Sequence, residues 1–303
     1  MTQAVVDAAN AFLDGLSPGQ RARALYGDAD PAMRQWIYFP SRRDRNGIAL
    51  GALTEAQRSA AFGVAAAMLS QRGYDQFRGV LAAEDELGLR NGEAHVNAGR
   101  YFIAIFGTPD TTGRFTVQIN GHHLAHHASF ANGAAMPTPS FVGTDPVEIV
   151  LDGGRVRPML GKTQAFSALL GGLGASELAA AEIDPVDDVR VGTGASDRYP
   201  ETQGIRVADL GAAQRGLVRD LVFAWVGDAA DAIAEPLMQR YLADFPDTRL
   251  AWSGSMDPDT KGAYLRLDGP RLWIEFSNVG RFGNGDNHYH SVLRDKEADY
   301  LAT

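Results

Sequence analysis

The feature that most constrains the fold is a change of hydrophobic period near residue 99. From Gly99 to Leu151 the apolar residues no longer recur at helical spacing. In 115–120, Phe, Val and Ile at odd positions alternate with Thr, Gln and Asn at even positions, which predicts a strand with one buried face. A second block of the same kind, with strands expected at 250–254, 263–267, 271–278 and 288–293, lies near the end of the chain.

The remaining segments have the pattern of helices. Capping boxes at Ser17 and Thr54 predict two helix starts. Apolar residues then recur at helical spacing through 61–69, 77–87, 161–182 and 210–225. Gly73 and Gly88 are expected to end helices, and the last helix to be interrupted before Pro236.

The order of elements is therefore helices, strands, helices, strands. Strands that come in blocks favour an α+β fold over a doubly wound one, with a mainly antiparallel sheet formed by the two strand blocks and helices packed around it. No convincing internal repeat or linker is apparent, so we expect a single α+β domain over 1–303. Its helical N-terminal region, about 1–90, should pack on the sheet.

Charge and composition exclude several classes of function. The 28 basic and 37 acidic residues give a net charge of −9, which argues against a nucleic-acid binder and against a partner of anionic membrane. No apolar run is long enough for a membrane span, and no signal peptide is visible, so a cytoplasmic protein is expected. The absence of cysteine excludes thiolate metal sites.

Histidine is concentrated in two places. Four of the seven histidines lie in Gly121–His127, and His288 and His290 are separated by a single residue. On a strand, residues i and i+2 point to the same face, so both imidazoles of the second group can reach one ion. Two half-exposed strand histidines are the alternative interpretation.

The first group cannot act as one ligand set. If the alternation of 115–120 continues, His122 and His126 share the polar face, whereas His123 and His127 lie on the apolar side, unless a bulge at Gly121 reverses the phase. One or two of these histidines with His288 and His290 would give three or four nitrogens. Such a set suits a divalent metal ion, with zinc expected ahead of copper or iron. His126 and His127 could equally hydrogen-bond within the sheet.

Three charged residues near the second group are candidate catalytic groups. Glu275 lies in an apolar strand, where a carboxylate is paired, ligates a metal or takes part in acid–base chemistry. Asp295 could orient a ligand histidine, and Arg294 could bind a carboxylate of a substrate. Simple ion pairs among these residues are the alternative interpretation.

The landmarks of this chain resemble those of an uncharacterised family, domain of unknown function 3500. The matching pieces are Trp36 with Phe39-Pro40, Arg45 with Gly47, Gln57-Arg58, Tyr101 with Phe106-Gly107-Thr108-Pro109, Gly121-His122-His123-Leu124, Pro139–Gly143 with Pro146, Ala251–Gly254, Ile274–Asn278 and His288–Asp295. They span nearly the whole chain. The resemblance implies no activity, but its pattern includes His122, His123, His288, His290, Glu275, Arg294 and Asp295 and leaves out His95, His126 and His127.

These observations predict a metal-dependent enzyme acting on a small molecule. The ion would be held by His122 or His123 with His288 and His290, and could activate water for hydrolysis of a small, anionic substrate. Glu275 or Asp295 would act as general base, and Arg294 would hold the substrate. A copper or non-haem iron oxidoreductase using the same histidines is one alternative. A non-catalytic binding protein with a His/Arg pocket and a structural metal site are the others.

Overall fold

The computed structural model describes residues 2–192, 198–280 and 286–301. Its α-helices are α1 (Thr2–Asp14), α2 (Pro18–Ala24), α3 (Glu55–Met68), α4 (Gln71–Asn91), α5 (Leu160–Gly171), α6 (Ala175–Ala181), α7 (Ala212–Val226) and α8 (Asp231–Ala243). Its strands are β1 (Leu25–Tyr26), β2 (Ile48–Ala49), β3 (Phe102–Gly107), β4 (Arg114–Gly121), β5 (Leu124–Ala131), β6 (Ala134–Met136), β7 (Ser140–Thr144), β8 (Ile149–Leu151), β9 (Gly154–Val156), β10 (Ile205–Arg206), β11 (Arg249–Ser253), β12 (Tyr264–Asp268), β13 (Leu272–Asn278) and β14 (Tyr289–Asp295).

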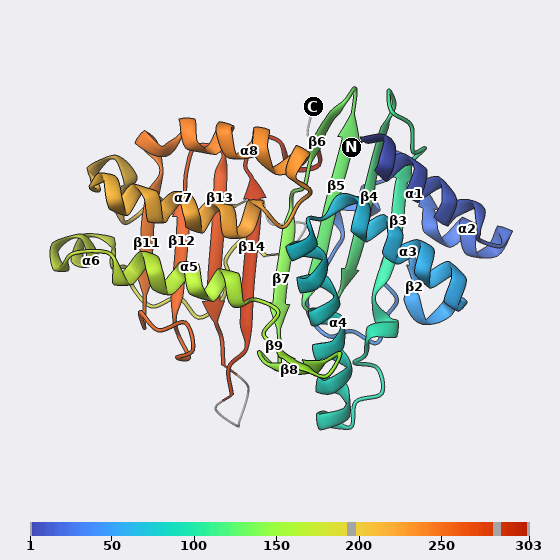
Figure 1. Ribbon diagram of the computed structural model, residues 1–303, viewed down its shortest axis with the longest axis horizontal. Coiled ribbons are helices and arrows are strands. Elements are labelled where there is room, and N and C mark those ends of the chain that lie inside the picture. Colours follow the sequence, from blue (N-terminus) through green and yellow to red (C-terminus); the bar gives the residue numbers. More distant parts are fainter. Residues whose placement is uncertain (1, 193–197, 281–285, 302–303) are drawn as a thin grey trace.

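Twelve of these strands form one sheet, in the order β1-β3-β4-β5-β7-β14-β13-β12-β11-β10, with β2 paired to β3 and β6 paired to β5. The pairings are antiparallel except for β1 with β3. The two predicted strand blocks therefore share a sheet, and they meet where β7 pairs with β14 (Figure 1). The prediction of an α+β fold with a mainly antiparallel sheet is confirmed.

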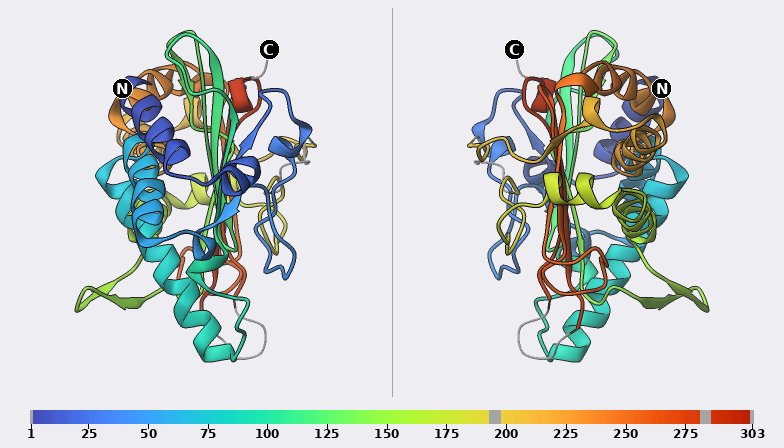
Figure 2. Two further views of the ribbon diagram at one scale, coloured as in Figure 1. Left: turned by 90° about the vertical axis from the view of Figure 1, so that its right-hand side faces the viewer. Right: turned by 90° about the vertical axis from the view of Figure 1, so that its left-hand side faces the viewer.

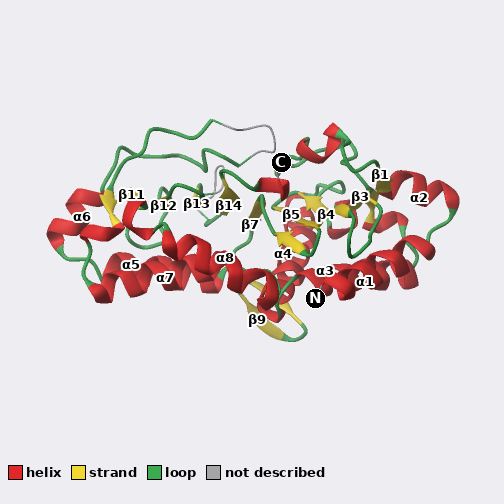
Figure 3. Ribbon diagram, turned by 90° about the horizontal axis from the view of Figure 1, so that it is seen from above, coloured by secondary structure: helices red, strands yellow, loops and turns green. Residues whose placement is uncertain are grey.

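The two faces of the sheet are covered differently. Helices α1, α3, α4, α5, α7 and α8 lie on one face, and long loops lie on the other (Figures 2 and 3). The main hydrophobic core lies between the helices and the sheet residues that face them, such as Val117, Leu124 and Ile274. A smaller cluster on the loop side includes Trp36 and Tyr38 packed with Phe141.

The local helix signals are partly correct. Ser17 and Thr54 are capping-box N-caps, as predicted. Gly73 and Gly88 do not end helices: both lie inside α4, which ends at Gly92 in the left-handed conformation. A Cβ on Gly73 would be 2.1 Å from the carbonyl oxygen of Asp228, so this glycine permits close packing. Pro236 lies inside α8, and the helix before it already ends at Val226.

The sheet is built from an internal repeat, so the expectation that the chain contains no repeat was wrong. A helix pair, a short strand, a second helix pair and four antiparallel strands occur twice in the same order: α1, α2, β2, α3, α4, β3, β4, β5, β7 and then α5, α6, β10, α7, α8, β11, β12, β13, β14. Strands β1 and β6 are additional in the first unit, and β8 and β9 lie between the two units in the sequence. The strand order mirrors itself about the β7–β14 pair. The two units therefore lie side by side and are joined by their last strands.

Individual contacts recur in both units. Ile48 pairs with Ile103 in the first unit, and Ile205 pairs with Leu250 in the second. The amide of Leu50 donates to the Tyr101 carbonyl at 2.8 Å, and the amide of Val207 to the Thr248 carbonyl at the same distance. The two units share a short sequence motif, in which Leu53-x-x-Ala56-Gln57-Arg58 corresponds to Leu210-x-x-Ala213-Gln214-Arg215.

A glycine precedes the short strand in each unit, and both are expected to be indispensable. Gly47 has φ +99° and Gly204 has φ +93°, and an added Cβ would lie 2.2 Å and 2.1 Å from a backbone oxygen of the neighbouring strand. Alanine at either position should destabilise the fold by about 3 kcal/mol. Gly216 in α7 has open space, so alanine there should stabilise by about 0.5–1 kcal/mol. Denaturant unfolding of the variants measures the expected loss of stability at Gly47 and Gly204 and the expected gain at Gly216.

None of the helices in the described ranges combines the length and the apolar character needed to cross a membrane.

Candidate metal centre

The first histidine pair forms a turn. Gly121 pairs with Leu124, so His122 and His123 are the two turn residues of the β4–β5 hairpin. This overturns the expected alternation, because the chain reverses direction after Gly121. His126 pairs with Ile119 and shares the helix-covered face, whereas His127 pairs with Gln118 and faces the loops.

The turn is fixed by its neighbours. His123 has φ +65°, a left-handed conformation that costs a non-glycine residue about 1 kcal/mol or more. Its carbonyl accepts a hydrogen bond from the amide of Gly143 at 2.7 Å, and its amide donates to the carbonyl of Tyr38 at 3.3 Å. A Cβ on Gly143 would lie 3.1 Å from both the His123 and the His290 rings. Glycine in β7 therefore leaves room for two imidazoles.

The second histidine pair meets this turn. His288 directly precedes β14 and His290 is its second residue, so their side chains share a face, as predicted. Nε2 of His288 lies 2.7 Å from Nε2 of His123. His123, His288 and His290 form a group whose ligand atoms all lie within 4.8 Å of one another, and such a group can hold a metal ion. Histidines far apart in the sequence thus converge on one site.

Two carboxylates fix the orientation of these rings. Oδ1 of Asp188 lies 2.7 Å from Nδ1 of His290. Oε1 of Glu84 lies 2.8 Å from Nδ1 of His122, and its Oε2 lies 3.5 Å from Nδ1 of His123. Since a carboxylate only accepts hydrogen bonds, it favours a proton on Nδ1 and leaves the lone pair on Nε2 for a metal.

Sequence reasoning missed Glu84 and Asp188. Glu84 is 2% exposed and lies in the apolar stripe of α4, with Val80, Leu81 and Leu87 at helical spacing. A carboxylate within such a stripe was the available signal. Asp188 lies in a loop, and no local pattern marks it.

Protonation of the buried centre is set by burial and by its charges. Burial and the neighbouring His122 lower the pKa of His123 to about 3, although Glu84 opposes this shift. Burial alone would raise the pKa of Glu84, but His122 and the hydrogen bonds from His122 and His123 lower it to about 2. At neutral pH His123 is therefore a neutral imidazole beside an ionised carboxylate, which is the state that a metal ligand needs.

The histidines open onto a pocket of about 990 Å³. His122, His288 and His290 line it, and His123 lies buried behind them. The other lining residues are Tyr38, Phe39, Pro40, Leu87, Arg90, Asn91, Glu93, Val96, Asp145, Asp187, Asp188, Lys261, Gly262, Asn278 and Val279. The volume suits a small molecule.

Glu275 lies away from this pocket and is fully buried. Its oxygens accept hydrogen bonds from Tyr264 Oη at 2.6 Å, Trp273 Nε1 at 2.8 Å and the amides of Arg190 and Val191 at 2.8 and 3.1 Å. Burial raises its pKa, and these hydrogen bonds only partly compensate. The contacts tie the loop that carries Asp188 to the sheet.

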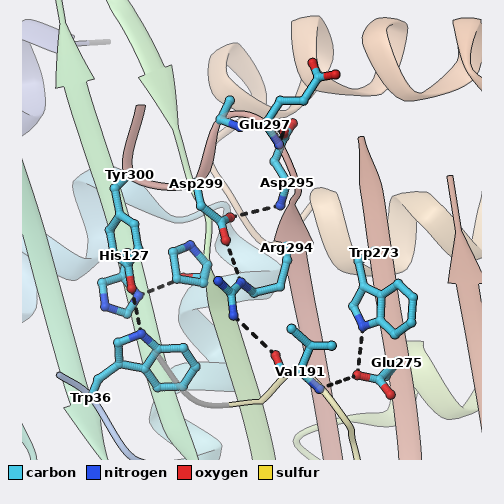
Figure 4. Close-up of polar contacts among 12 residues, drawn as sticks. Trp36, His127, Val191, Trp273, Glu275, Arg294, Asp295, Glu297, Asp299 and Tyr300 are labelled. Atoms are coloured by element: carbon cyan, nitrogen blue, oxygen red, sulfur yellow. Dashed lines mark hydrogen bonds and ion pairs between the residues drawn. The ribbon is translucent and has the colours of Figure 1, made fainter. Parts of the chain in front are cut away.

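Arg294 and Asp295 also have partners of their own (Figure 4). Arg294 donates to Asp299 at 2.5 Å and to the carbonyl of Val191 at 3.5 Å. Asp295 accepts from Tyr241 Oη at 3.1 Å and from two backbone amides of the following turn. Neither residue lines the pocket, and neither belongs to the group formed by His123, His288 and His290. Their catalytic roles, like that of Glu275, stay predictions.

His126 and His127 are fully enclosed by the fold. Nδ1 of His127 donates to the Pro139 carbonyl at 2.7 Å, and its Nε2 accepts from the side-chain Nε2 of Gln118 at 2.8 Å. Nδ1 of His126 lies 2.9 Å from Oγ of Ser140. Burial lowers the pKa of His127 to about 3 and that of His126 to about 4. Both histidines hydrogen-bond within the sheet, which was the alternative interpretation of these residues.

These two histidines predict acid sensitivity. Because their folded pKa values lie below the unfolded value of about 6.5, their contribution to stability is complete above that pH and is lost as the pH falls towards 4. Burial lowers the pKa of His123 in the same way, so with three such groups the free energy of unfolding of the metal-free protein should fall by about 4 kcal/mol per pH unit between these pKa values. His126→Asn should reduce this slope by about a third. Urea unfolding of chelator-treated protein between pH 7.5 and 4.5 checks this without interference from metal release.

The corresponding hairpin of the second unit carries different chemistry. Its turn residue Arg271 donates to Oδ2 of Asp244 at 2.7 Å, at the end of α8. In the first unit, the same place between hairpin turn and helix is taken by His122 and His123 with Glu84. Contact between turn and helix is thus common to both units, but the first unit places His122, His123 and Glu84 there, and β14 of the second unit brings His288 and His290 to this turn.

Comparison with known proteins gives a family and no function. The model of one family, described as protein of unknown function (DUF3500), matches residues 1–302. No match was found among curated proteins or among solved structures.

Proposed function

The chain belongs to the DUF3500 family, whose function is unknown, and from the site that it carries we propose that the protein is a metal-dependent hydrolase. The observation that carries the proposal is the convergence of His123, His288 and His290 at the wall of a pocket. Three neutral imidazoles with an open fourth position are the ligand set of a catalytic zinc site.

The ligand geometry supports zinc with a small adjustment. Tetrahedral ligation at about 2.0–2.1 Å places neighbouring nitrogens roughly 3.3 Å apart. Nε2 of His123 and Nε2 of His288 are 2.7 Å apart, so zinc binding requires a movement of about half an ångström. His288 can supply this movement, because it precedes β14 and is only half-buried.

A catalytic site is favoured over a closed structural one. Among the described residues, the ion-binding group contains three ligands, two of which line the pocket. A structural zinc site has four protein ligands. The open position would therefore hold water, whose pKa a zinc ion lowers towards about 7.

The pocket lining favours a neutral or cationic substrate over the anionic one expected from the sequence. Among the described lining residues, the basic side chains are Arg90 and Lys261. They are outnumbered by the acidic side chains Glu93, Asp145, Asp187 and Asp188. Arg294, which was expected to bind an anion, is engaged by Asp299. We propose that one of these carboxylates, Asp188, orients His290 and does not bind substrate.

Activity of the metal-stripped and zinc-reloaded protein tests the proposal. The probes are a neutral nitrophenyl ester, a lysine nitroanilide and, as the anionic comparison, nitrophenyl phosphate. Zinc should restore hydrolysis of one of the first two, and His288→Ala should abolish the restored activity. Hydrolysis that survives stripping, or that persists in the zinc-treated variant, argues against a metal-dependent mechanism. Copper or iron in place of zinc would favour the oxidoreductase alternative.

A further inference from the structure

The His123 ring offers its second nitrogen to another cluster. Glu84, His122 and His123 form a second group whose ligand atoms all lie within 4.8 Å of one another. We propose that this group binds a second metal ion, so that His123 joins two ions as a bridging imidazolate. The inference rests on the proposed function, because the bridge requires an ion on Nε2 of the same ring.

The two groups use opposite edges of one imidazole. Nε2 of His123 faces His288 at 2.7 Å, whereas its Nδ1 faces Oε2 of Glu84 at 3.5 Å. Nδ1 of His122 lies 2.8 Å from Oε1 of Glu84, and the two histidine rings stack with centroids 3.6 Å apart. Both sites can therefore be filled at once without turning the ring.

The carboxylate has coordination capacity to spare. Oε2 of Glu84 is buried and makes no hydrogen bond of normal length; Nδ1 of His123 lies 3.5 Å away. A buried carboxylate oxygen without a close partner is costly, and a metal ion would satisfy it. Nitrogen and carboxylate oxygen together form a common zinc ligand set.

Access and local charge set the expected affinity. His122 lines the pocket, so an ion can reach the second group from solvent. Arg45 also acts electrostatically on Glu84, and its positive charge opposes a second cation. The second ion should therefore bind more weakly than the first.

The bridging ring also fixes the distance between the two ions, and this distance limits the role of the second ion. With metal–nitrogen distances near 2 Å on each edge of the ring, the ions would lie roughly 6 Å apart. Two-metal hydrolases that clamp one reacting group hold their ions about 3.5–4 Å apart. The second ion therefore would not share the reactive water. It would replace the Nδ1 proton of His123, which is released to solvent, and so make that ring a stronger ligand for the first ion.

Metal stoichiometry is the first test. Stripped full-length protein is titrated calorimetrically with zinc, and bound metal is measured after gel filtration. We expect about two equivalents per chain, falling to about one in Glu84→Gln and in His122→Asn. His123→Ala should lose both, and His95→Ala should lose neither. One equivalent in the wild type that Glu84→Gln leaves unchanged overturns the second site and preserves the first. No bound metal overturns both.

Copper substitution tests the bridge itself. Two Cu(II) ions joined by one imidazolate couple antiferromagnetically, so the EPR intensity of protein with two coppers should fall well below that of two isolated ions. Glu84→Gln loaded with one copper should give the full signal of a single ion. Two coppers with full, uncoupled intensity would contradict the bridge.

Discussion

Replacing His288 with alanine should reduce zinc affinity by more than about 100-fold, because even loss of an outer hydrogen-bond partner of a ligand costs about 10–100-fold. His288 lines the pocket, and its Nε2 lies 2.7 Å from Nε2 of His123. It lies outside the regular strand and is half-buried, so the variant should fold. Calorimetric zinc titration of stripped protein measures the effect.

The matched control for this variant is His95→Ala. His95 is also half-buried but lies outside both groups that could hold a metal ion. Its removal should leave zinc affinity within error of the wild type. Equal loss in the two variants would mean that the titration reports non-specific binding, and an unchanged affinity in His288→Ala would remove this residue from the site.

Replacing Glu275 with alanine should destabilise the protein by about 3–5 kcal/mol. Two backbone amides, the Tyr264 hydroxyl and the Trp273 indole would lose their acceptor in a fully buried place. The loop at Arg190 and Val191 would also be released, and with it Asp188, which orients His290. Denaturant unfolding measures the loss of stability.

Glu297, which is exposed, provides the comparison for this change. Glu297→Ala should alter stability by less than about 0.5 kcal/mol. If Glu275→Ala instead keeps full stability and loses only activity, then Glu275 is catalytic, as the sequence first suggested. Zinc affinity, measured below the unfolding transition, should fall by about 10–100-fold in Glu275→Ala, because release of Asp188 removes the hydrogen-bond partner of His290.

Much of the fold could be predicted from local patterns. Alternation in 115–120 marks β4, and the capping boxes at Ser17 and Thr54 mark the starts of α2 and α3. These signals are local because strand alternation and helix caps depend on neighbours within a few residues. The internal repeat could not be recognised in this way, since the two units share little beyond Leu-x-x-Ala-Gln-Arg and a glycine before each short strand.

The candidate site was predicted only in outline. His288 and His290 share a face because their spacing decides it. His122 and His123 were misplaced, because the alternation was continued through Gly121 where a two-residue turn reverses the chain. Glu84 and Asp188 reach the histidines only through tertiary packing. For Glu275, a carboxylate in an apolar strand allowed several roles, and its four hydrogen-bond donors, which favour a structural one, come together only in the fold.

Metal content of the protein purified without a nickel column tests the central claim most directly. Elemental analysis should find at least about one equivalent of zinc per chain in the wild type and less than about a tenth of that in His288→Ala. Wild-type protein without stoichiometric zinc, copper, iron or manganese, and unable to take up zinc after stripping, would contradict the account.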